Sequence, residues 1–122
     1  MTTTRAGYVV PLTAAIVLLA LGTATTHLFL GFQLTSFGGW ALGILFILNG
    51  LGYIGLTALL YLPVRALDPY RGVIRYALIG FAALTIVLWV PLGTKSVLGY
   101  LNKINELILI ALLVFESRVA RR

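Results

Sequence analysis

The sequence predicts an all-α membrane protein: an antiparallel four-transmembrane-helix bundle with both termini cytoplasmic. Three observations lead to this prediction. Of the 122 residues, 61% are apolar and only 10% are charged, which is more hydrocarbon than a soluble domain of this size can bury. The apolar residues fall into four blocks, each close to the ~20 residues that a helix needs to cross a bilayer. The cations gather on one side of those blocks.

The four blocks are expected to form one domain, residues 1–122. The spans cover about 8–32, 39–62, 72–90 and 98–115. Pro63 ends the second span and Pro91 the third, because proline cannot continue the helical hydrogen bonds. Inside a bilayer the backbone must satisfy its own polar groups, so the spans are helices and not strands. The links are short, which favours antiparallel neighbours.

The nine Lys and Arg residues predict the orientation. Seven lie on the side shared by the termini and the middle link: Arg5, Arg65, Arg71, Arg75, Arg118, Arg121 and Arg122. Only Lys95 and Lys103 lie toward the other side. Cytoplasmic loops carry the excess of cations, so the chain is expected to be a multi-pass plasma (inner) membrane protein, N-in and C-in. Apart from Arg5, these arginines are expected to contact lipid headgroups.

The N-terminal segment allows a second interpretation. Arg5, an apolar run and the small residues "GTATT" resemble a cleavable signal peptide. The apolar run continues past that point to Phe32, which favours a retained helix.

Polar residues early in the fourth span point to one site. Asn102, Lys103, Asn105 and Glu106 lie in its outer half, where an unpaired carboxylate costs several kcal/mol or takes up a proton. Glu106 is therefore expected to face protein, with His27 of the first span as its partner. Lys103 is the competing partner, although it lies close enough to the boundary to snorkel outward. If Lys103 folds inward, Glu106 pairs with it and His27 is left to a backbone carbonyl or water.

The candidate polar pocket draws on all four spans. Its expected members are His27, Asn49, Thr85, Trp89, Asn102, Lys103 and Glu106. Three interpretations stay open: the polar residues hold the helices together, they form a functional pocket, or they lie at the membrane interface. The second span also contains glycines that let a neighbouring helix approach closely: Gly39, Gly43, Gly50, Gly52 and Gly55.

Several kinds of chemistry lack a sequence signature. The chain has no cysteine and a single histidine, so neither a thiolate nor a multi-histidine metal site is expected within one chain, and bis-histidine haem would need two chains. GxSxG, HExxH and P-loop motifs are missing. No catalytic residue, metal site or required cofactor is predicted. The net charge of +6 is attributed to membrane topology and not to nucleic-acid binding.

Four stretches resemble a group of small prokaryotic four-helix integral membrane proteins of unknown function. They are "HLFLGF", "GILFILNGLGYIGLTALLYLP", "RYALIGFAALTIVLW" and "GYLNKINELILIALLVFE". The features that are similar are His27, the Asn49–Tyr53 stretch, Trp89, Gly99–Tyr100 and Lys103. The resemblance implies the four-helix architecture and brings no activity with it. A looser similarity to DoxX-type four-helix proteins rests on architecture alone.

Three functions agree with the sequence, and an enzyme is the less favoured interpretation. The first is a non-enzymatic protein that acts by association, either as an accessory subunit of a membrane complex or as a homo-oligomer, with the lipid bilayer, other membrane subunits or itself as partners. The second is a small-molecule or ion carrier that uses the outer-leaflet polar pocket. The third is an intramembrane redox or proton-transfer protein.

Overall fold

The computed structural model describes residues 3–93 and 95–120, with side chains from residue 10 onward. Four α-helices follow one another: α1 (Thr3–Ser36), α2 (Trp40–Tyr61), α3 (Arg71–Leu92) and α4 (Val97–Ala120). A short 3₁₀ helix, η1 (Arg65–Tyr70), connects α2 to α3. Each α-helix contains a stretch long and apolar enough to cross a membrane, so the chain is an all-helical, multi-pass membrane protein by length and composition.

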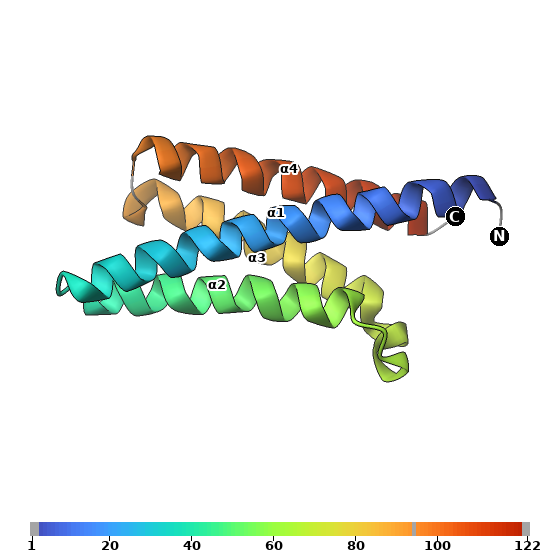
Figure 1. Cartoon of the computed structure of the whole chain (residues 1–122), viewed down its shortest axis with the longest axis horizontal. Coiled ribbons are helices and arrows are strands. Elements are labelled where there is room, and N and C mark those ends of the chain that lie inside the picture. The colour runs from blue at the N-terminus through green and yellow to red at the C-terminus, as the bar shows by residue number, and fades with distance from the viewer. Residues whose placement is uncertain (1–2, 94, 121–122) are drawn as a thin grey trace.

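The helices pack in a ring of neighbours. Helix α1 contacts α2 and α4, and α3 contacts the same two helices. The first turns of α1 and the last turns of α4 lie at one end of the bundle together with η1, and we call this the terminal end (Figure 1). The α1–α2 and α3–α4 links lie at the opposite end, which we call the link end (Figure 1).

The helix bounds differ from the sequence prediction at several points. Helix α1 continues to Ser36 and α4 to Ala120, each several residues beyond the predicted span. Helix α3 includes Pro91 in its last turn, where the missing N–H removes a single hydrogen bond, and ends one residue later. The middle link, for which the sequence predicted only a short connection, forms η1.

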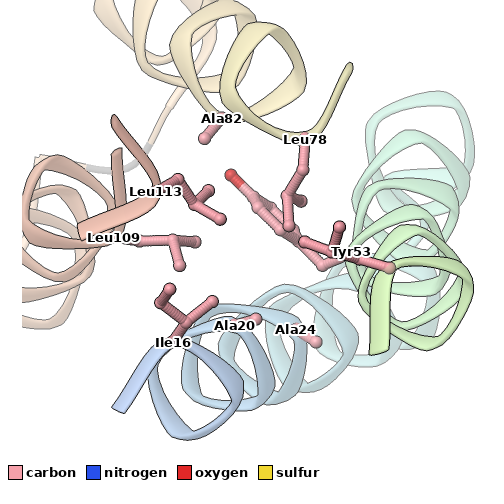
Figure 2. Packing of buried hydrophobic residues seen from close by; sticks show 9 residues of the cluster. Ile16, Ala20, Ala24, Tyr53, Leu78, Ala82, Leu109 and Leu113 are labelled. Atoms are coloured by element: carbon pink, nitrogen blue, oxygen red, sulfur yellow. The ribbon is translucent and has the colours of Figure 1, made fainter. Parts of the chain in front are cut away.

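The centre of the bundle is a small apolar core (Figure 2). Nine buried residues from all four α-helices form it: Ile16, Ala20, Ala24, Tyr53, Leu60, Leu78, Ala82, Leu109 and Leu113. The alanines of α1 keep that helix close to its neighbours, as small residues do between membrane helices. The Tyr53 ring lies among these residues and is fully buried. Its hydroxyl group therefore needs a partner inside the protein.

Three glycines of α2 pack closely against other helices. A Cβ at Gly43 would lie 2.9 Å from the carbonyl oxygen of Gly31 on α1, and a Cβ at Gly50 would lie 2.9 Å from that of Ala24. A Cβ at Gly52 would lie 2.5 Å from the Phe81 ring of α3. Substitution at these positions must therefore move a neighbouring helix or ring.

The prediction that the glycines of the second span pack against a neighbouring helix is wrong for Gly55. Gly39 packs within the α1–α2 turn instead. Gly55 is exposed, and no atom lies within 4 Å of the place where its Cβ would be. The spacing of Gly55 from the packed glycines turns it away from both neighbouring helices. Gly39 is the N-cap of α2 and lies in the α1–α2 turn, where a Cβ would meet the Leu34 carbonyl oxygen at 3.1 Å.

Two of the arginines expected at lipid headgroups have partners within the protein. The Arg71 guanidinium donates hydrogen bonds to carbonyl oxygens at the C-terminal end of α2 and just beyond it: those of Leu59, Leu60, Leu62 and Val64. It also pairs with Asp68 at 3.2 Å. These bonds satisfy carbonyls that a helix end leaves without intrahelical partners.

Arg75 points into the bundle, where its Nε lies 2.7 Å from Glu116 Oε1. Only 13% of the Arg75 side chain is exposed, so the headgroup interpretation is wrong for this residue. Arg65 and Arg118 are exposed, which leaves them able to meet headgroups. The side chain of Arg5 and the residues Arg121 and Arg122 lie outside the part of the chain that the structure describes.

Candidate functional site

Glu106 is the most deeply buried charged residue of the described chain, with 0% of its surface exposed. Three helices supply its partners. Thr23 of α1 donates a hydrogen bond to Glu106 Oε2 at 2.9 Å, and the Tyr53 hydroxyl of α2 donates to the same oxygen at 2.7 Å. Lys103 of α4 forms an ion pair with Oε1. We call these residues, together with His27, the Glu106 cluster.

Lys103 folds inward, which is the second of the two orientations that the sequence left open. The residue is only 7% exposed and lies one turn before Glu106 on the same helix. Its ammonium group pairs with the Glu106 carboxylate. A charged side chain that is enclosed by protein lowers its energy by pairing with an opposite charge, and an i, i+3 spacing makes that pair available within the helix. The ion pair leaves the Glu106 cluster with little net charge.

His27 does not pair directly with Glu106, which rules out the first of the two arrangements expected from the sequence. Its Nδ1 lies 2.8 Å from the carbonyl oxygen of Thr23 and 3.3 Å from the Thr23 hydroxyl oxygen. A carbonyl oxygen only accepts, so Nδ1 carries the proton and donates it. His27 and Glu106 therefore meet through Thr23. In the neutral ring, Nε2 is left with a lone pair that can accept a hydrogen bond.

A pocket opens beside the Glu106 cluster, in the half of the bundle next to the link end. Its empty space is about 430 Å³, a volume that includes open space outside the mouth. The polar lining comes from all four helices: His27, Asn49, Thr85, Trp89 and Lys103. The apolar lining comes from α2 and α3: Leu45, Phe46, Leu88 and Leu92. Small-molecule sites combine such apolar walls with a few polar groups.

The mouth of the pocket faces the surroundings of the bundle. Leu45, Leu88 and Leu92 are 45%, 40% and 47% exposed, respectively, and they lie on two neighbouring helices. In a membrane-spanning bundle these residues contact lipid. Part of the pocket lining therefore belongs to the lipid-facing surface of α2 and α3.

Asn49 leaves one hydrogen-bond acceptor unused at the pocket. Its Nδ2 donates to Thr85 Oγ1 at 2.7 Å, and the Thr85 hydroxyl in turn donates to the Phe81 carbonyl oxygen at 2.9 Å. While the Thr85 hydroxyl donates to Phe81, its oxygen accepts from Asn49 Nδ2. Asn49 Oδ1 is buried, and no described residue donates to it. Such an atom costs free energy unless something binds it.

Asn102 belongs to the same region without joining the hydrogen-bond network. It lines a smaller cavity together with His27, Trp89 and Lys103. The residue is 6% exposed, and its side-chain amide makes no hydrogen bond within residues 3–93 and 95–120. The expected proximity of Asn102 to His27 is present, whereas a hydrogen bond to Glu106 is not among those of the described residues.

Trp89 lines the pocket in its part toward the link end. Its ring meets Tyr100 of α4 edge to face, with centroids 5.0 Å apart. Lys95 Nζ lies 4.2 Å from the Trp89 ring centroid and donates to the carbonyl oxygens of Val90 and Gly93. A Cβ at Gly93 would clash with the Trp89 ring. These contacts hold the indole in one orientation over the pocket.

A second buried carboxylate lies near the terminal end, and sequence reasoning missed it. The Tyr61 hydroxyl lies 2.9 Å from both oxygens of Glu116, and Arg75 Nε lies 2.7 Å from Oε1. Glu116 is 8% exposed. It sits beyond the predicted end of the fourth span, where a carboxylate needs no special explanation. Its spacing of ten residues from Glu106 could have indicated a second polar position on the same helix side.

Tyr53 and Thr23 were also not assigned to Glu106 in advance. Thr23 shares a helix stripe with His27 at i, i+4, which is a usable signal. Tyr53 gave no such signal, because a tyrosine in an apolar span usually indicates an interface.

The residues that the structure describes hold no group of three or more His, Cys, Asp or Glu that could bind a metal ion.

Comparison of the chain with protein-family models, with curated proteins and with solved structures found no match.

Proposed function

We propose that this protein is a small membrane-embedded carrier that binds an amphipathic small molecule in the pocket between α2 and α3. The observation that supports this most strongly is Asn49 Oδ1, a buried acceptor without a donor at the edge of an apolar pocket. Polar groups that only hold helices together are normally satisfied by each other. Glu106 has Lys103, Thr23 and Tyr53 as partners, whereas no described residue donates to Asn49 Oδ1.

Action by association, the first hypothesis from the sequence, has less specific support. Apolar helix surfaces suit lipid and a protein partner equally well. The exposed Gly55 on α2 and Gly80 on α3 favour a partner helix, because each leaves room for a close approach. A pocket with a mouth toward lipid and an unsatisfied acceptor favours a ligand more directly, so we place the carrier first.

Binding can be tested through the fluorescence of Trp89. The chain has two tryptophans, so Trp40→Phe leaves Trp89 as the only one. We expect 4-hexylphenol, a small amphipathic probe, to change the Trp89 emission with a saturable dependence on concentration, because the indole lines the pocket. In the same background, Thr85→Phe should abolish the saturable change by filling the pocket.

Thr25→Phe is the matched control, because Thr25 is exposed on α1 and does not line the pocket. It should leave binding unchanged. Helix content from circular dichroism must match between the two variants. A change in emission that rises linearly with probe and ignores Thr85→Phe would contradict the proposal, since it reports partition into detergent or lipid.

The proposed topology is an antiparallel bundle in the plasma (inner) membrane, with both termini cytoplasmic. Seven arginines against two lysines support it, as do the exposed Arg65 and Arg118. The pocket then lies in the outer leaflet. Fluorescent-protein fusions at the C-terminus should be bright, and alkaline phosphatase inserted in the 92–97 link should be active. An active phosphatase at the C-terminus would reverse the orientation.

A further inference from the structure

The hydrogen-bonding groups that line the pocket indicate the chemical class of its ligand. Asn49 Oδ1 is a buried acceptor to which no described residue donates. His27 Nδ1 donates its proton to the Thr23 carbonyl oxygen. The other ring nitrogen, Nε2, is therefore a hydrogen-bond acceptor in the neutral ring. Both residues line the pocket. A molecule that satisfies either atom must bring an O–H or N–H group.

The positive charge of Lys103 does not make the pocket a binding site for an anion. Lys103 lines the pocket, but its ammonium is already paired with Glu106 Oε1. A carboxylate or phosphate ligand would lie near both charges of that pair and would lose its own hydration. Charges removed from water are stabilised only when they are paired. The ion pair therefore selects for a neutral ligand.

The walls of the pocket indicate the shape of the rest of the ligand. Leu45, Leu88 and Leu92 form an apolar path from the pocket to the lipid-facing surface. The Trp89 ring adds a flat face, held in place by Tyr100. An apolar tail can remain among the lipid chains while a small polar head meets Asn49.

From these observations, and resting on the carrier function proposed above, we infer that the ligand is a neutral, membrane-soluble phenol or alcohol whose hydroxyl group donates to Asn49 Oδ1. Two sources share this chemistry: a lipid alcohol with a long chain, and a hydroquinone-like phenol. The Trp89 face suits the flat ring of the second, and the leucine path suits the chain of both.

Two matched pairs of probes test the inference by Trp89 emission in the Trp40→Phe background. The first pair is 4-hexylphenol and its methyl ether, 4-hexylanisole; the second is dodecanol and dodecyl methyl ether. Each ether keeps the apolar body and loses the donor. We expect the hydroxyl compound to bind roughly three- to tenfold more tightly than its ether in at least one pair, as one hydrogen bond to a buried acceptor predicts. The pair that shows the preference identifies the source.

Two variants locate the preference. Asn49→Leu keeps the branched shape of the side chain and removes the acceptor, so it should abolish the preference for the hydroxyl compound. Thr57→Val is the matched control, because Thr57 Oγ1 is also buried without a described partner but does not line this pocket. It should leave the preference intact.

The other outcomes separate this inference from the proposed function. Equal saturable binding of alcohol and ether, or a preference that survives in Asn49→Leu, overturns the inference and leaves the carrier in place. Tighter binding of the anion 4-hexylbenzoate than of 4-hexylphenol overturns the neutral class. Absence of saturable binding by every probe overturns the carrier together with the inference.

Discussion

Replacing Glu106 by leucine is expected to lower the free energy of unfolding by about 3–5 kcal/mol, the usual loss when one partner of a buried ion pair is removed. The substitution leaves the Lys103 ammonium enclosed without its counter-charge. It also takes the acceptor away from the hydroxyl groups of Thr23 and Tyr53. Unfolding by sodium dodecyl sulfate in mixed micelles, followed by circular dichroism, measures the loss.

The double variant Glu106→Leu/Lys103→Met provides the control. Replacing both charges by apolar groups of similar size is often close to neutral, so much of the lost stability should return. A Glu106→Leu variant as stable as the wild type would show that Lys103 reaches water and that the Glu106 cluster is not a closed unit.

The second large effect is expected at the closest approach of α1 and α2. Gly43→Leu should cost about 1–3 kcal/mol, the range for overpacking a filled interior. A Cβ there would lie 2.6 Å from Thr35 Cγ2 and 2.9 Å from the Gly31 carbonyl oxygen. Because one of these contacts is backbone, the two helices must separate to admit the new side chain. The same unfolding measurement in mixed micelles applies.

Gly55→Leu is the matched control on the same helix. It adds the same side chain where no atom lies within 4 Å, so the stability of the monomer should change little or rise through better helix propensity. Equal losses at Gly43 and Gly55 would show that helix α2 tolerates side chains on both sides equally, contrary to the packing described above.

The helices could be predicted because their physical cause is local. Apolar length defines a span, and Pro63 together with the charged middle link separates α2 from α3. The bounds were less accurate where neighbouring contacts extend a helix. Helix α4 continues past Phe115 because Glu116 accepts hydrogen bonds from Arg75 and Tyr61. These partners are 41 and 55 residues away in the chain. A window of sequence does not contain them.

The site could be predicted in part for the same reason. Depth along each span placed His27, Lys103 and Glu106 in one layer of the bundle. The pairing within that layer depended on side-chain direction, and the structure has Lys103 rather than His27 beside Glu106. Asn49 and Thr85 were both among the candidate residues, but their hydrogen bond requires the rotation of α2 against α3, which hydropathy does not determine.

The rotation of α2 also explains the errors at its glycines. Gly43 and Gly50 are seven residues apart and face α1, whereas Gly55 is five residues further along and faces outward. In sequence Gly43 belongs to a GxxxG match with Gly39, but nothing distinguishes Gly50 from Gly55. The contact between helices separates them.

The most direct test of the carrier is native mass spectrometry of the protein released from its own membrane. We expect the wild-type chain to carry one additional mass of a neutral amphiphile, because the pocket between α2 and α3 offers a buried acceptor to it. The Thr85→Phe variant should lose this mass, and the Thr25→Phe variant should keep it. A wild-type chain without any bound amphiphile, or a bound mass equally abundant in both variants, would contradict the account.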